Sequence, residues 1–85
     1  MMKEKILADL KDLILTVRDK GQELREPHLF GLWSAKLLMV KDASNALSED
    51  DRDWIDGELQ EWFEKEVKPK LNDAQKKLLE ERFTS

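Results

Sequence analysis

The sequence predicts an all-α protein, a small antiparallel helical bundle of three long helices plus a short C-terminal helix. Apolar residues recur at spacings of three and four along most of the chain, as on one face of a helix. Both prolines stand next to the expected helix ends. Charged residues make up 40% of the chain, which suits amphipathic helices. The 85 residues are expected to form one helical domain, residues 1–85.

The first helix is expected over about residues 3–24. Five apolar residues form one stripe along it: Ile6, Leu10, Leu13, Val17 and Leu24. Gly21 suits a C-terminal cap, although residues 22–25 could extend the helix by another turn. Pro27 disfavours helical geometry at the residue before it and so ends the helix.

The second helix begins near Pro27, contains residues 29–47 and is apolar almost all round. One face carries Phe30, Trp33, Leu37 and Val40, and the opposite face carries Leu32, Ala35, Met39, Ala43 and Ala46. A helix of this kind is normally covered on several sides. Gly31 lies early in it, and we expect close packing against a neighbouring helix there.

The third helix is expected to begin at Ser48, which suits an N-cap, with Asp51 as the acid of a capping box. It runs to about Val67, with Ile55, Leu59 and Trp62 at the centre of its buried face. Pro69 breaks it. The last helix opens at Asn72, with Gln75 as a second capping pair.

Most of the negative charge lies in one segment. Residues 49–66 contain nine acids and two bases, a net charge of −7, whereas the whole chain carries −4. One side of the third helix is therefore acidic, through Asp50, Asp53, Asp56, Glu61 and Glu64.

None of the familiar catalytic or metal-binding motifs is complete in this sequence. It has no cysteine, its single histidine is His28, and its three glycines stand alone. The acidic run 50–57 fails as a calcium loop, because Ile55 stands where the fifth ligand belongs and Gly57 comes one residue late. We expect no enzyme activity, no cofactor and no metal.

No apolar stretch approaches the roughly 18–20 residues that span a membrane, and the N-terminal residues alternate charged with apolar. A cytoplasmic protein without membrane contact is therefore expected.

Two kinds of protein partner are compatible with this sequence. Leu32, Met39 and Ala43 could contact a partner, including a second copy in a homodimer, unless the C-terminal helix covers them. Alternatively, the acidic side of the third helix could bind a basic protein, as an inhibitor, immunity-type protein or nucleic-acid mimic would, unless it is only a solvated surface. Direct nucleic-acid binding is not expected, because its candidate residues supply only four charges and no aromatic residues are interleaved with them: Lys68, Lys70, Lys76 and Lys77.

Overall fold

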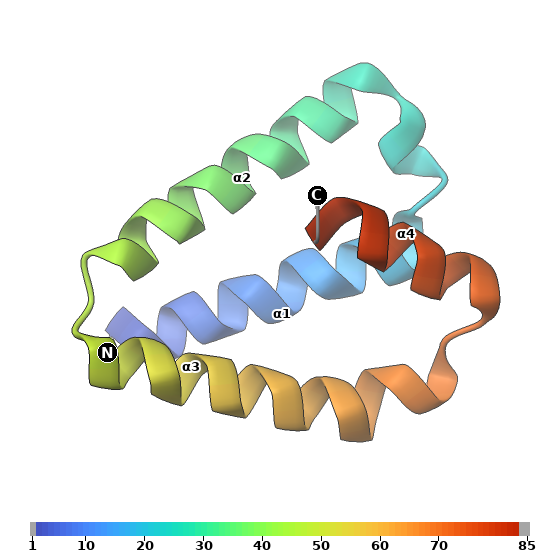
Figure 1. The fold of residues 1–85 in the computed structure, drawn as a ribbon. Helices are drawn as coiled ribbons and strands as arrows, with labels where there is room; N and C mark the ends of the chain where they lie inside the picture. Colours follow the sequence, from blue (N-terminus) through green and yellow to red (C-terminus); the bar gives the residue numbers. More distant parts are fainter. Residues whose placement is uncertain (1, 84–85) are drawn as a thin grey trace.

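The computed structural model describes residues 2–83, and its central element is α1 (Met2–Lys20). Three further helices pack against α1: α2 (Pro27–Asn45), α3 (Glu49–Trp62) and α4 (Asp73–Phe83) (Figure 1). Residues 2–83 contain no β-strand, which confirms the predicted all-α fold class.

Two contacts fix the relative direction of α1 and α3. Lys3 Nζ lies 4.8 Å from the ring centroid of Trp54, and Lys11 Nζ lies 5.4 Å from that of Trp62. Residue numbers increase together along the two helices, so α1 and α3 run in the same direction. Figure 1 shows α2 and α4 running the opposite way.

The core forms where these helices meet α1. Its most buried apolar side chains are Leu13 and Val17 of α1, Ile55 of α3 and Val67. The helical stripe predicted from the sequence accounts for the α1 residues, because positions three or four apart share one helix face. Leu79 of α4 closes the same cluster.

The first helix ends earlier than predicted. α1 stops at Lys20, and the chain then makes a 3₁₀ turn over Glu23–Arg25. Gly21 is not a left-handed cap, since no described glycine has positive φ. It is instead a point of close approach, because a Cβ there would lie 2.8 Å from Leu78 Cδ1 and 2.7 Å from Val17 O.

The third helix also departs from the predicted continuous helix to Val67. Its α-helical part ends at Trp62, followed by a π turn (Phe63–Val67) and a 3₁₀ turn (Lys68–Lys70). The backbone N–H of Lys68 donates to the carbonyl of Phe63, five residues earlier. Pro69 has no N–H to donate, and its ring would clash with the carbonyl four residues before it, so regular winding cannot continue.

Ser48 and Asn72 are N-caps where the sequence predicted them, whereas the carboxylate of Asp51 pairs with Lys3 of α1. Ser48 Oγ accepts a hydrogen bond of 3.2 Å from the Asp51 N–H. At the start of α4, the Gln75 N–H donates to Asn72 Oδ1 and the Asn72 N–H donates to Gln75 Oε1. Gln75 Nε2 also donates to the carbonyl of Arg18 at 2.9 Å, which ties the start of α4 to the end of α1.

Candidate functional site

The N-terminal cap of α2 comes from a residue that the sequence did not single out. The carboxylate of Glu26 accepts from the backbone N–H groups of His28 and Leu29, at 3.0 and 2.9 Å. Pro27 occupies the first turn, where a missing N–H costs nothing. The capped helix then continues for 19 residues to Asn45.

The inner face of α2 is fixed by Trp33. Its Nε1 donates to the carbonyl of Leu13 in α1 at 3.2 Å, and the side chain is buried. The ring of Phe83 meets that of Trp33 edge-on, with centroids 5.5 Å apart. Leu37 and Val40 are buried along the same side. These contacts determine which way the remaining residues of α2 point.

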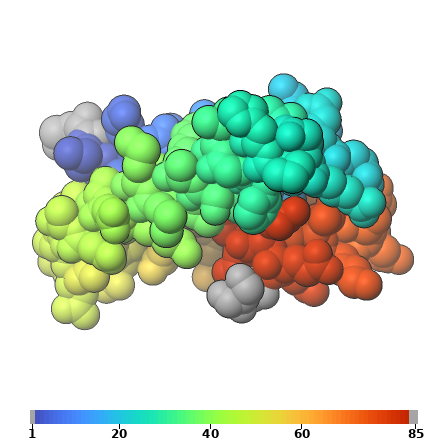
Figure 2. All heavy atoms as spheres, turned by 90° about the horizontal axis from the view of Figure 1, so that it is seen from above, coloured from blue at the N-terminus to red at the C-terminus, as the bar shows by residue number. Residues whose placement is uncertain are grey.

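The opposite side of α2 remains in solvent. We call it the outer α2 face and define it by Leu32, Ala35, Met39, Ala43 and Ala46. Leu32 is 59% exposed and Met39 72% exposed, Ala35 and Ala46 are exposed, and Ala43 is half-buried. Figure 2 shows α2 crossing this side of the molecule with no described element lying over it. The two partner-binding candidates with long side chains, Leu32 and Met39, are therefore accessible.

The C-terminal helix does not cover the outer α2 face, so that alternative is wrong. α4 reaches α2 on its inner side, where Phe83 contacts Trp33 and Arg82 lies 4.3 Å from the ring centroid of Phe30. The expected close packing at Gly31 is also wrong, because a Cβ there would meet no atom within 4 Å.

A shallow hollow borders the outer α2 face where α2 meets α1. Its volume is about 340 Å³. Met2, Ile6, Met39 and Ala43 form much of its apolar wall, and Lys5, Asp9, Lys36 and Val40 complete the lining. Met2 is 61% exposed. The apolar surface thus extends from α2 on to the first turn of α1.

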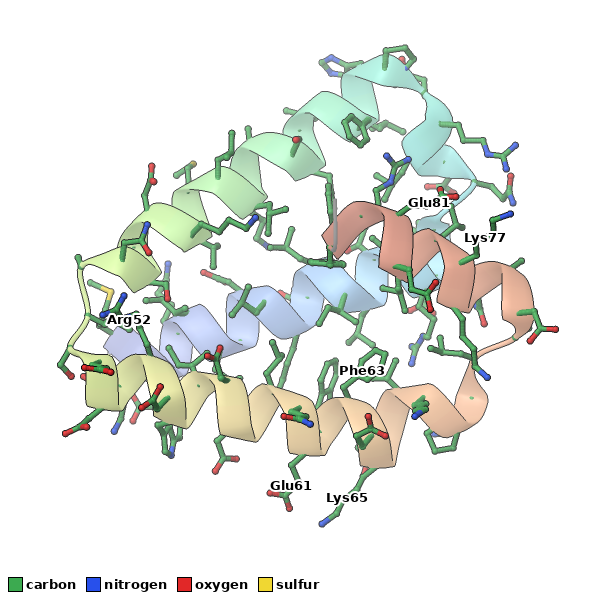
Figure 3. The ribbon with its side chains drawn as sticks, in the orientation of Figure 1. Arg52, Glu61, Phe63, Lys65, Lys77 and Glu81 are labelled. Atoms are coloured by element: carbon green, nitrogen blue, oxygen red, sulfur yellow. The ribbon has the colours of Figure 1, made fainter. Side chains whose placement is uncertain are left out.

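The five acidic candidates on α3, namely Asp50, Asp53, Asp56, Glu61 and Glu64, are all exposed. Two of them are paired, since Lys65 Nζ lies 2.8 Å from Glu61 and Lys68 Nζ lies 3.2 Å from Glu64. Figure 3 shows Glu61 and Lys65 pointing away from the helices. The hydrogen bond from Lys65 lowers the pKa of the Glu61 carboxyl.

The three aspartates in the N-terminal half of α3 differ from these two glutamates in their pairing. Asp50, Asp53 and Asp56 form no ion pair with any described residue, whereas the neighbouring Asp51 pairs with Lys3 of α1 at 3.6 Å. The structure therefore divides the five predicted acids into an unpaired group of three and a neutralised group of two.

The described residues bring together no cluster of chemical groups. Within residues 2–83, no three His, Asp or Glu side chains are placed to hold one metal ion. His28 is exposed at the first turn of α2, and residues 50–57 lie in α3 and do not form a loop.

A second hollow, of about 370 Å³, lies between α1, α4 and the π turn. Its apolar lining includes Ile14, Phe63, Leu71 and Leu79. Phe63 is directed toward it from the end of α3 (Figure 3). The sequence did not reveal this hollow, because its shape depends on the π turn. Pro69 signals an interruption of the helix in the sequence, but a proline does not predict the geometry of that interruption.

Comparison with known proteins gives no assignment. No protein-family model matches the chain, and neither a curated protein nor a solved structure was found to be similar to it. Within residues 2–83, no helix has the length and apolar content needed to cross a membrane.

Proposed function

We propose that this protein acts by protein–protein contact and not by catalysis, and that it binds a second copy of itself through the outer α2 face. The observation that carries the proposal is the exposure of Met39 and Leu32 on one helix stripe, at 72% and 59%. Contiguous exposed apolar surface on a small protein usually marks an interaction site.

The chemistry of the outer α2 face favours an apolar partner. Its five residues are uncharged, and Lys36 and Asp42 flank it with opposite signs. The unpaired acids Asp50, Asp53 and Asp56 belong to α3 and are not part of this stripe. Removing a side chain such as Leu or Met from water is worth about 1.5–3 kcal/mol.

The test is the molar mass in solution, measured by light scattering on a sizing column over a range of concentrations. Twice the 10.0 kDa chain mass is expected at high concentration. Met39→Glu places a charge on the outer α2 face and should give a monomer. Leu38→Glu is the matched control, because Leu38 is adjacent and 61% exposed but lies outside the stripe. A wild-type monomer at every concentration, or a Met39→Glu dimer, would contradict the proposal.

A second candidate function follows from the unpaired acids of α3. Asp50, Asp53 and Asp56 could attract a basic protein, as an inhibitor or adaptor would. Such binding depends on exposed charge, which salt screens beyond about 8–10 Å near physiological ionic strength. Binding to an oligolysine peptide should then weaken steeply between low and high salt, whereas association through the outer α2 face should change little.

A cytoplasmic location belongs to the same proposal. A chain without cysteine is compatible with a reducing compartment.

A further inference from the structure

We infer that Arg25 and Arg82 bind a carboxylate whose attached apolar group packs on Leu24, Pro27 and Phe30. These five residues line one shallow hollow, of about 390 Å³, where the start of α2 meets the end of α4. Small-molecule sites in proteins have volumes in this range. The inference goes beyond the proposed function, because the hollow shares no residue with the outer α2 face.

The fold brings the two arginines together from distant parts of the chain. Arg25 ends the 3₁₀ turn before α2, and Arg82 lies in the last turn of α4. The guanidinium carbon of Arg82 lies 4.3 Å from the ring centroid of Phe30. Stacking on an aromatic ring fixes the plane of a guanidinium group and leaves its edge able to donate hydrogen bonds. One of the two cations is therefore oriented by the fold itself.

Neither arginine is neutralised by the part of the chain that the structure describes. No described residue forms an ion pair with Arg25 or Arg82. The Nε of Arg82 is also buried without a hydrogen-bond acceptor among residues 2–83. Buried donors in folded proteins nearly always have an acceptor, because an unpaired one costs free energy. A ligand with an anionic group would supply that acceptor.

The acids nearest in sequence to the two arginines are Glu23, Glu26 and Glu81, and none of them lines the hollow. Both carboxylate oxygens of Glu26 accept hydrogen bonds from the backbone N–H groups of His28 and Leu29. The three acids lower the electrostatic potential around the hollow but leave the guanidinium donors unoccupied. Recognition of an anion therefore depends on direct hydrogen bonds and not on long-range attraction.

The lining of the hollow favours a carboxylate over a phosphate. A guanidinium group can donate two parallel hydrogen bonds to either anion. The other lining residues, Leu24, Pro27 and Phe30, have apolar side chains. A phosphate would place additional charged oxygens against these side chains without donors, which is unfavourable. A carboxylate has two oxygens and can carry an aromatic or aliphatic group that covers the apolar lining.

The test is an NMR titration of the ¹⁵N-labelled protein with sodium benzoate. The chain contains only four arginines, Arg18, Arg25, Arg52 and Arg82, so single variants can assign every side-chain Nε–H signal. The signals of Arg25 and Arg82 should shift saturably and give one dissociation constant, in the millimolar range expected of a small ligand. The signals of Arg18 and Arg52 should stay in place.

Arg25→Gln and Arg82→Gln should each weaken benzoate binding about tenfold or more, because each removes hydrogen bonds to a charged group. Arg52→Gln is the matched control, since it removes the same charge from α3, where Figure 3 labels Arg52. Its effect should be less than about twofold, because salt screens distant exposed charges. Arg25 is exposed, so Arg25→Gln tests the site even where Arg82→Gln disturbs the fold. Circular dichroism checks that each variant is helical.

Two further anions test the class of ligand. Acetate should bind about tenfold more weakly than benzoate, because it lacks the apolar area of the ring, and phosphate should also bind more weakly. Benzoate that gives no saturable shift at Arg25 and Arg82 would overturn the site. An equal loss of binding in Arg52→Gln would also overturn it, because binding would then follow the net charge. Acetate or phosphate that binds as tightly as benzoate would overturn the assignment to a carboxylate with an apolar group.

Discussion

α2 and α3 both pack against α1, but they expose opposite chemistry to solvent. On α3, the aromatic rings that the core does not fully cover are met by cations from α1. Lys3 lies over Trp54 and Lys11 over Trp62, so the lysine stems shield apolar surface while the ammonium groups reach water. The far side of α3 is acidic and fully solvated.

On α2 a cation covers only the inner side, where Arg82 lies over the ring of Phe30, and the outer α2 face has no such cover. Met39 and Leu32 are exposed, although Lys36 lies on the same helix and borders both hollows beside them. Long charged side chains thus shield the tryptophan rings of α3, whereas the outer α2 face stays open. The contrast teaches that exposed large apolar side chains are not spread evenly over the described residues, since four of the five lie on α2: Leu29, Leu32, Leu38 and Met39.

The largest expected effect is a difference in the free energy of unfolding between substitutions on the inner side of α2 and on its exposed side. Leu37 is 8% exposed and Leu38 is 61% exposed, one residue apart on the same helix. Leu37→Ala should lower the free energy of unfolding by about 2–4 kcal/mol, because it leaves a cavity in the core. Leu38→Ala should change it by less than about 0.5 kcal/mol.

The measurement is urea unfolding of the dilute monomer, followed by tryptophan fluorescence. Equal effects of the two substitutions would mean that α2 is rotated about its axis from the described orientation. The outer α2 face would then be misplaced as well.

The sequence predicted much of what is local in this fold. The cap at Ser48 and the pair Asn72–Gln75 were identified correctly, because each depends on residues three positions apart. The two apolar faces of α2 were also recognised from their spacing. The division of the acidic residues on α3 into paired and unpaired was not, since it depends on which lysines reach back along the helix.

The features that the sequence did not predict depend on contacts between residues far apart in the chain, or on the local form of the backbone. The sequence could not tell whether the C-terminal helix covers the outer α2 face, because the place of α4 depends on contacts such as that of Phe83 with Trp33. It could not foresee that Gln75 also bonds to the Arg18 carbonyl, 57 residues away. The π turn before Pro69 was missed because a proline predicts a break and not its form.

Replacing a glycine in α2 and one in α3 compares the two helices again. The expected change in the free energy of unfolding is smaller than for Leu37→Ala. Gly31 of α2 and Gly57 of α3 both have open space where a Cβ would stand. Each change to alanine should raise the free energy of unfolding by about 0.5–1 kcal/mol, because glycine in a helix interior costs backbone entropy.

Gly21→Ala is the matched control, since its Cβ would lie 2.7 Å from the backbone oxygen of Val17. It should destabilise the protein in the same thermal unfolding series. A gain at Gly57 with a loss at Gly31 would show that the surroundings of Gly31 on α2 are not open in the molecule measured.

The smallest expected effect concerns the acidic side of α3. Lys65 donates to Glu61 at 2.8 Å and lowers the pKa of that carboxyl. Because the pKa is lower in the folded state, the pair stabilises the fold above the ordinary carboxyl pKa and loses that contribution as the pH falls through the lowered value. Lys65→Met should raise the pKa of Glu61 toward its ordinary value, as measured by NMR titration of the side-chain carboxyl carbons.

Lys70→Met is the control, because Lys70 forms no ion pair with a described residue and should leave the Glu61 titration unchanged. Both members of the pair are exposed, so water and salt screen it and the free energy of unfolding at neutral pH should hardly change. A large loss of stability from Lys65→Met would mean that charge pairing on α3 holds the fold together. The acidic side of α3 would then contribute to stability. It could no longer be contrasted, as a merely solvated surface, with the exposed apolar residues of the outer α2 face.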